Sequence, residues 1–396
     1  MSSSMLFETM ATANEKKIGI ATLNSPQKLN GLSLEMSELM LAQLMKWQRD
    51  PAIAVVVLKG AGEKAFCAGG DLQALYKTLQ ENQGGDPWEN RYARNFFDVE
   101  YRLDYLIHTF EKPILCWGSG IVMGGGVGLM MGASHRVVSE TTRFAMPEIS
   151  IGLFPDVGGT RMLSHLPGGI GLFLGLTGAQ LGAGDCRYLG LADYMLETAR
   201  WPAAMQAIQA QPWSDSRPDN DIRLHKILFG LQPQSPLPPG ALQKNHTLIK
   251  ELCDGPDFSS ICASILALAT SDDPWLARAA ATFQTGSPGS ARLTFALLDK
   301  VRHLSLAQVF QQEYIVSLQC CVQGDFQEGI RALLIDKDKT PNWNPATLSG
   351  ATQDWVQRFF EPAWPHGTLH PLADLGCTQA EQTIAAPREP QRNLVY

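Results

Sequence analysis

Hydrophobic residues in the first part of the chain follow two different spacings. Residues 17–24 (KIGIATLN) alternate apolar and polar positions, which predicts a strand, and residues 54–59 (AVVVLK) form a short apolar run that is typical of a strand buried on both faces. Between them, residues 34–49 carry Leu, Met and Trp at helical spacing after a good N-cap, Ser33. The order strand, helix, buried strand predicts an α/β fold with parallel strands.

The pattern changes after about residue 200, where strand signals nearly vanish and a Pro-rich linker (232–240) precedes segments with helical periodicity. The final stretch is polar and poorly patterned. We therefore expect four parts, namely a frayed leader (1–16), an α/β core (17–200), a mainly helical region (201–345) and a tail (346–396).

The core is organised around residues 117–156. Three consecutive glycines, Gly124 to Gly126, follow a predicted strand and open a predicted short helix. Glycine runs cost backbone entropy, so this one indicates either that a ligand approaches the backbone N–H groups of a helix N-terminus or that a helix packs tightly on a sheet. The dinucleotide fingerprint, the P-loop and the G-x-S-x-G elbow of serine hydrolases do not match.

Three carboxylates occur in apolar surroundings. Glu148 and Asp156 each follow a proline in mostly apolar sequence, where an unpartnered acid should have a raised pKa that suits general acid/base catalysis. Asp156 could equally cap a helix that begins at Val157, whereas Glu148 has no evident capping role. Glu100 falls on the apolar stripe of a helix predicted over residues 88–110, so it either lies at the edge of the stripe or faces a polar pocket.

Composition narrows the classes of function. The 396 residues carry a net charge of −7 without a dense Lys/Arg block, which gives no support for binding to nucleic acid or to a membrane surface. No C-x-x-C pair or H-E-x-x-H motif supports a metal site. The eight cysteines, several of them within apolar runs, and the lack of a signal-peptide pattern favour a reducing, cytoplasmic setting.

Two motifs then identify a family. The segments FCAGGD (66–71) and MGGGVG (123–128) resemble the two oxyanion-hole motifs of the crotonase (enoyl-CoA hydratase/isomerase) superfamily. The segments FAMPEISIGLFPDVGG (144–159) and DFQEGIRALLIDKDKTPNWNP (325–345) are similar to the 3-hydroxyisobutyryl-CoA hydrolase family, and the resemblance covers about residues 17–345.

The resemblance implies a spiral of repeated ββα units with an α-helical C-terminal region. It implies an oxyanion hole for an acyl-CoA thioester, made by the backbone N–H groups of Ala68 and Gly125, with Glu100, Gly125, Glu148 and Asp156 lining the substrate. Coenzyme A would be part of the substrate, and no separate cofactor is implied. The superfamily often forms trimers, so a homo-oligomer is compatible with the sequence, although the helical region could cover that interface.

One departure from the superfamily pattern decides between reactions. Hydratases carry a glutamate where this chain has Gly128, and that glutamate works with a second one that corresponds to Glu148. The missing acid favours thioester hydrolysis, with Glu148 as nucleophile or general base and Asp156 as an orienting or protonating group. An enoyl-CoA isomerase (or hydratase) and a non-catalytic acyl-CoA-binding protein are the alternatives.

Overall fold

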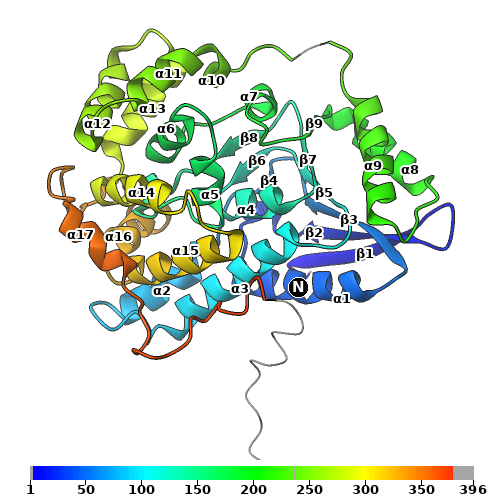
Figure 1. The fold of residues 1–396 in the computed structure, drawn as a ribbon, viewed down its shortest axis with the longest axis horizontal. Coiled ribbons are helices and arrows are strands. Elements are labelled where there is room, and N and C mark those ends of the chain that lie inside the picture. The colour runs from blue at the N-terminus through cyan, green and yellow to red at the C-terminus, as the bar shows by residue number, and fades with distance from the viewer. Residues whose placement is uncertain (1–2, 236, 378–396) are drawn as a thin grey trace, which may run out of the picture.

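Repeated strand pairs followed by a helix form the centre of the molecule in a computed structural model that describes residues 3–235 and 237–377 (Figure 1). In each unit the first strand joins a large sheet and the second joins a small one. The units are β3 (Ile53–Gly60), β4 (Ala65–Cys67) and α2 (Leu72–Glu81), then β5 (Ile114–Gly118), β6 (Ile121–Met123) and α4 (Gly125–Gly132), then β7 (His135–Val138), β8 (Arg143–Ala145) and α5 (Gly159–Ser164). The predicted ββα spiral is confirmed.

The large sheet has six strands in the order β1-β2-β3-β5-β7-β9, and all neighbours are parallel except β1 and β2. The strands not yet placed are β1 (Met5–Ala11), β2 (Lys17–Leu23) and β9 (Tyr194–Met195). The prediction of a frayed leader over residues 1–16 is wrong for β1, because Met5 to Ala11 pair in register with Leu23 to Lys17. The residues of β1 (MLFETMA) do not alternate apolar and polar positions as those of β2 do. This strand therefore forms through backbone pairing with β2 and could not be recognised from its side-chain pattern.

The two faces of the large sheet are covered by different helices. Val56 and Leu58 of β3 face the core beneath α1 (Leu34–Arg49) and α3 (Arg91–His108), while Val55 and Val57 face a second core under α8 and α9. This double burial explains the continuous apolar run of β3. In Figure 1, α8 (Trp201–Gln209) and α9 (Arg217–Leu231) lie on the opposite side of the molecule from the remaining C-terminal helices.

The C-terminal half is helical over its described residues, as predicted. Helix α15 (Leu306–Cys320) runs beside α3, and α16 (Phe326–Ile330), continued by a π-helical turn (Arg331–Ile335), packs on α2 (Figure 1). The other helices are α6 (Ile170–Thr177), α7 (Ala183–Tyr188), α10 (Ala241–Lys244), α11 (His246–Cys253), α12 (Phe258–Ala267), α13 (Pro274–Thr285), α14 (Pro288–Lys300) and α17 (Gln353–Gln357). The four-part division of the chain stays a prediction.

The tail predicted from residue 346 packs on the rest of the molecule as far as residue 377. Val356 and Leu372 are buried in the main core, and Asp374 forms an ion pair with Arg102 of α3 at 2.7 Å. The remainder of the predicted tail, residues 378–396, lies outside the described residues.

Candidate active site

The two glycine motifs meet because β4 and β6 are neighbouring parallel strands. Cys67 pairs with Val122, so the residues after each strand emerge at the same edge of the small sheet. A Cβ on Gly126 would lie 2.3 Å from the carbonyl oxygen of Cys67, and Gly124 has a positive φ of 51°. Close packing of the backbone therefore explains part of the glycine run, and it brings the N-terminus of α4 against the first motif.

Free N–H groups are present in both motifs. Gly125 is the first residue of α4, so its N–H has no acceptor within the helix. The N–H of Ala68, which we predicted as the second donor, donates to the carbonyl of Leu29 at 3.1 Å, and its role in an oxyanion hole stays a prediction. Among the described residues the N–H of Gly70 has no acceptor, and both Gly70 and Gly125 line one cavity.

That cavity has a volume of about 340 Å³ and holds the three carboxylates that the sequence singled out, Glu100, Glu148 and Asp156. All three side chains are buried, with 3–5% of their surface exposed. Apart from Ser150, the other lining residues are apolar or glycine, and they include no Lys, Arg or His. Proton transfer to a bound molecule therefore falls to the carboxyl groups.

Glu148 has a buried carboxyl oxygen without a hydrogen-bond partner among the described residues. It begins a short 3₁₀ helix (Glu148–Ile151), and its side chain reaches back to the first glycine of the triplet, where a Cβ on Gly124 would be 3.1 Å from Oε1. Among the described residues Oε2 has no hydrogen-bond partner. Burial, followed by the charges of Asp156 and Glu100, raises the pKa of Glu148 well above its usual range, as expected for an acid held ready for a bound molecule.

Asp156 is held by a hydrogen-bond chain from neighbouring helices. The hydroxyl of Tyr101 donates to Oδ2 at 2.8 Å and lies 2.6 Å from Oγ of Ser317 on α15. Burial raises the pKa of Asp156 to about 6, and the bond from Tyr101 opposes that rise. This value lies near neutral pH, where a group can both donate and accept a proton.

The N-terminus of helix α5, which Asp156 could have capped, is capped by another residue. Helix α5 begins after Gly158, and Glu313 of α15 accepts hydrogen bonds from the N–H groups of Gly158 (2.7 Å) and Thr160 (3.2 Å). Sequence reasoning missed Glu313, because a cap supplied from a distant helix leaves no local signature.

Helix α3 contributes a second acid that sequence reasoning missed. Asp104 lies one turn after Glu100 on the same helix face and is fully buried, and neither of its carboxyl oxygens has a partner among the described residues. The signal was available, because at helical spacing Asp104 also falls on the apolar stripe. Burial and then the charge of Glu100 raise the pKa of Asp104 well above its usual range.

A Cβ at either of two glycines of α4 would collide with one of these carboxyl groups. A Cβ on Gly125 would lie 2.5 Å from Oε1 of Glu100, and a Cβ on Gly128 would lie 2.8 Å from Oδ2 of Asp104. The glycines of α4 thus make room for carboxyl groups of α3 as well as for a ligand. No set of three or more His, Cys, Asp or Glu side chains suited to a metal ion is found over residues 3–235 and 237–377.

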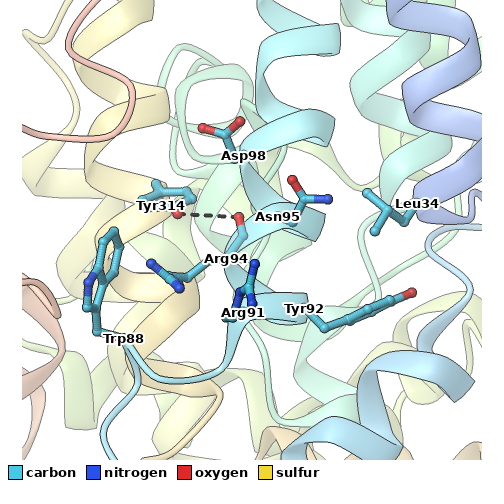
Figure 2. Close-up of a pocket in the computed structure, with 8 residues that line it drawn as sticks. All are labelled: Leu34, Trp88, Arg91, Tyr92, Arg94, Asn95, Asp98 and Tyr314. Atoms are coloured by element: carbon cyan, nitrogen blue, oxygen red, sulfur yellow. Dashed lines mark hydrogen bonds between the residues drawn. The ribbon is translucent and has the colours of Figure 1, made fainter.

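A larger cavity, of about 680 Å³, lies near the beginning of α3 (Figure 2). The guanidinium of Arg94 stacks over Trp88 at 4.1 Å, and the hydroxyl of Tyr314 donates to the backbone carbonyl of Arg94 at 3.3 Å. Its single acid, Asp98, forms an ion pair with Arg102 at 3.0 Å. None of the four buried acids lines this cavity, so the smaller cavity is the better candidate for chemistry.

Comparison with known proteins identifies the family. The family model described as enoyl-CoA hydratase/isomerase matches residues 18–360. The chain is 37% identical to the mitochondrial 3-hydroxyisobutyryl-CoA hydrolase of Danio rerio, over 90% of this chain and 89% of that protein. It is 39% identical to the mitochondrial 3-hydroxyisobutyryl-CoA hydrolase of Xenopus tropicalis, over 86% of each.

A solved structure supports the same grouping. The crystal structure of an enoyl-CoA hydratase from Rhodobacter sphaeroides is 34% identical to this chain and superposes with a TM-score of 0.78, covering 91% of this chain and 98% of that one.

The predicted location is contradicted by these relatives. We expected a cytoplasmic setting from the cysteines and from the absence of a signal-peptide pattern, but both vertebrate relatives are mitochondrial. Free cysteines indicate a reducing compartment and cannot distinguish one such compartment from another, which is why the inference failed. Over the described residues, the structure contains no helix with the length and apolar character needed to span a membrane.

The paired sheets, the glycine-opened helix beside buried acids and the match over most of the chain agree with one another. This protein belongs to the enoyl-CoA hydratase/isomerase family, within its group of 3-hydroxyisobutyryl-CoA hydrolases.

Proposed function

We propose that this protein hydrolyses the thioester bond of a short 3-hydroxyacyl-CoA, most simply 3-hydroxyisobutyryl-CoA, an intermediate of valine breakdown. The products are the free 3-hydroxy acid and coenzyme A. The observation that carries the proposal is the buried carboxyl of Glu148, whose Oε2 has no hydrogen-bond partner in the described part of the chain, in one cavity with the N–H groups of Gly70 and Gly125. The curated relatives carry the name of this hydrolase.

The two N–H groups would hold the thioester carbonyl oxygen as it becomes an oxyanion. Gly125 is well suited to this because it stands at the N-terminus of α4, where the helix dipole favours negative charge. Each donor of such a hole is typically worth about 2.7–4 kcal/mol of barrier. The absence of a side chain at both positions lets the carbonyl approach the backbone.

Glu148 would then supply the attack on the carbonyl carbon. Its carboxylate either attacks directly, giving an anhydride that water resolves, or takes a proton from the attacking water. Its raised pKa strengthens it as a base once it is ionised. Asp156, whose pKa is about 6, is placed to orient the substrate hydroxyl or to protonate the departing thiolate.

Hydration of a double bond is the reaction that the site supports least. The position of the first hydratase glutamate is Gly128, and the space in front of it is filled by Asp104 and Val157. An enoyl-CoA isomerase needs one acid and stays the alternative, as does a non-catalytic acyl-CoA-binding protein. A bare binding protein has no use for a desolvated acid at Glu148.

Release of free thiol from a panel of acyl-CoA thioesters tests the proposal. We expect 3-hydroxyisobutyryl-CoA to give free coenzyme A and crotonyl-CoA to remain unhydrated. Glu148→Gln keeps the shape of the side chain, so substrate should still bind while kcat falls by about 10²–10⁴-fold. Conversion of a 3-enoyl-CoA without release of thiol from the hydroxyacyl substrate would establish the isomerase, and an unchanged kcat in Glu148→Gln would remove that residue from the mechanism.

A further inference from the structure

Asp156 stands at the start of a tight turn whose backbone is strained. The N–H of Gly159 donates to the carbonyl of Asp156 at 2.6 Å. The two residues between them, Val157 and Gly158, have positive φ angles of 53° and 79°. Positive φ at both central positions is the mark of a type I′ turn, in which glycine and asparagine are favoured. Val157 is β-branched, so its left-handed conformation is strained and persists only where the surroundings hold it.

Helix α15 holds this turn through one buried side chain. The carboxyl group of Glu313 accepts a hydrogen bond at 2.7 Å from the N–H of Gly158, which belongs to the turn itself. It accepts two more from Thr160, one from the N–H at 3.2 Å and one from the hydroxyl. Glu313 is fully buried, so water does not compete for these bonds. The backbone that carries Asp156 is thus fixed to α15.

The same face of α15 also holds the carboxyl group of Asp156. The hydroxyl of Tyr101 has a single hydrogen, which it donates to Asp156. The 2.6 Å bond between the hydroxyls of Tyr101 and Ser317 must therefore be donated by Ser317, which lies one helical turn after Glu313. Donation by Ser317 polarises the Tyr101 hydroxyl and strengthens its bond to Asp156.

No opposite charge in the cavity holds Asp156 in place. The titratable groups whose charges interact with it are Glu100, Tyr101 and Asp104 of α3, Glu148 of the 3₁₀ helix, and Glu313 and Cys320 of α15. None of these groups is a cation, and the lining of the cavity contains no Lys, Arg or His. An ionised Asp156 is repelled by any ionised neighbour, so its position depends on the turn and on the hydrogen bond from Tyr101.

We propose that Glu313 and Ser317 are positioning residues for Asp156. Glu313 sets the turn on which Asp156 stands, and Ser317 sets the direction of its carboxyl group through Tyr101. Neither residue lines the cavity, so both act through Asp156 and not on the substrate. The inference rests on the proposed hydrolase function, and it gives one helix of the C-terminal half control over both the backbone and the side chain of Asp156.

A double-mutant cycle on kcat tests whether Glu313 acts through Asp156. Glu313→Ala removes the acceptor that holds the turn and should lower kcat for thiol release by up to about 10²-fold, the loss expected when a reacting group is displaced by about 1 Å. Glu313→Gln keeps an acceptor oxygen and should recover part of this loss. In Asp156→Ala the carboxyl group is gone, so adding Glu313→Ala should lower the residual kcat no further.

Two outcomes of the cycle overturn the role of Glu313. One is a wild-type kcat in Glu313→Ala. The other is an equal fall of kcat with and without Asp156, which is the result of a general loss of structure. If Glu313→Ala does not fold, Glu313→Gln keeps the shape of the side chain and completes the same cycle with a smaller loss.

Ser317→Ala tests the contact to the carboxyl group by a measurement that needs no turnover. The bond from Tyr101 opposes the rise in the pKa of Asp156 caused by burial, so weakening this bond should raise that pKa above its wild-type value of about 6. Carbon NMR of protein labelled at the aspartate carboxyl groups follows the titration, and the signal is assigned as the one missing from Asp156→Asn. An unchanged titration in Ser317→Ala overturns the role of Ser317.

Gln311→Ala is the control on the same helix. Its side chain donates to the carbonyl of Leu372 at 2.9 Å and makes no described contact with Asp156, so kcat and the titration of Asp156 should both stay at wild-type values. A change in either that matches Ser317→Ala would show that any substitution on α15 has the same effect, against the inference. A wild type that releases no thiol from any acyl-CoA overturns the hydrolase function, whereas the titration still decides whether Ser317 acts on Asp156.

Discussion

Replacement of Asp156 by asparagine should stabilise the fold at neutral pH and weaken the enzyme. The pKa of Asp156 rises from an ordinary value of 3.8 to about 6 in the folded protein, chiefly because the side chain is buried. The folded state therefore binds the proton more tightly than the unfolded chain does, and the stability this gives is present below about pH 4 and lost as the pH rises to about 6. A rise of about two pH units, at 1.36 kcal/mol each, corresponds to about 3 kcal/mol.

Asparagine does not ionise, and its side-chain oxygen can still accept the hydrogen bond from Tyr101. The free energy of unfolding of Asp156→Asn minus that of wild type should thus become more positive by about 2 kcal/mol between pH 4 and pH 7. Urea unfolding at several pH values measures this difference, with the exposed Asp272→Asn as a control for a surface change. A difference in unfolding free energy that does not vary with pH, or that falls as pH rises, would refute the raised pKa of Asp156. An undiminished kcat in Asp156→Asn would show that Asp156 has no part in the reaction.

Two further substitutions test the donors and the missing acid. Gly70→Pro removes the N–H that we assign to the oxyanion hole and should lower kcat by about 10²–10³-fold. Gly70→Ala keeps the N–H and adds a Cβ only 3.3 Å from the side chains of Leu72 and Phe96. Equal losses of kcat in both variants, measured by thiol release, would argue against a donor at this position. Gly128→Glu should fail to hydrate crotonyl-CoA and should destabilise the fold by about 1–3 kcal/mol, because the new side chain meets Asp104 and Val157 at 2.8 Å; a stable variant with hydratase activity would show that this space is open.

The spacing of apolar residues predicted those helices and strands in which each face has one kind of environment along its whole length. The apolar run of β3 and the capped, periodic helix α1 were both readable, because one strand is buried on both faces and one helix has a single buried stripe. The short strands β4 and β6 were not predicted, since three residues are too few to show a period. Their pairing is set by the neighbouring strands, and it is this pairing that brings the two glycine motifs together.

The site could be predicted where a residue type conflicts with its surroundings. Glu100 and Glu148 are acids in apolar sequence, and both line the cavity. The second donor could not be fixed from the motif, because the N–H of Ala68 donates to the carbonyl of Leu29, which lies almost forty residues earlier in the chain. Glu313 and Tyr101 were missed for a related reason, namely that their importance lies in partners brought close only by folding.

The structure changes what Gly128 means. In the sequence it marked an acid that hydratases have and this chain lacks. In the folded protein the place opposite Gly128 is occupied by a carboxyl group after all, that of Asp104, which reaches it from α3 and lies behind Glu100 rather than in the cavity. An acid that does not line the cavity cannot add water across a double bond of a bound molecule, but Asp104 lies within one helical turn of Glu100, which does line it. The same glycine at which this chain lacks the hydratase acid therefore makes room for a buried carboxyl group from α3.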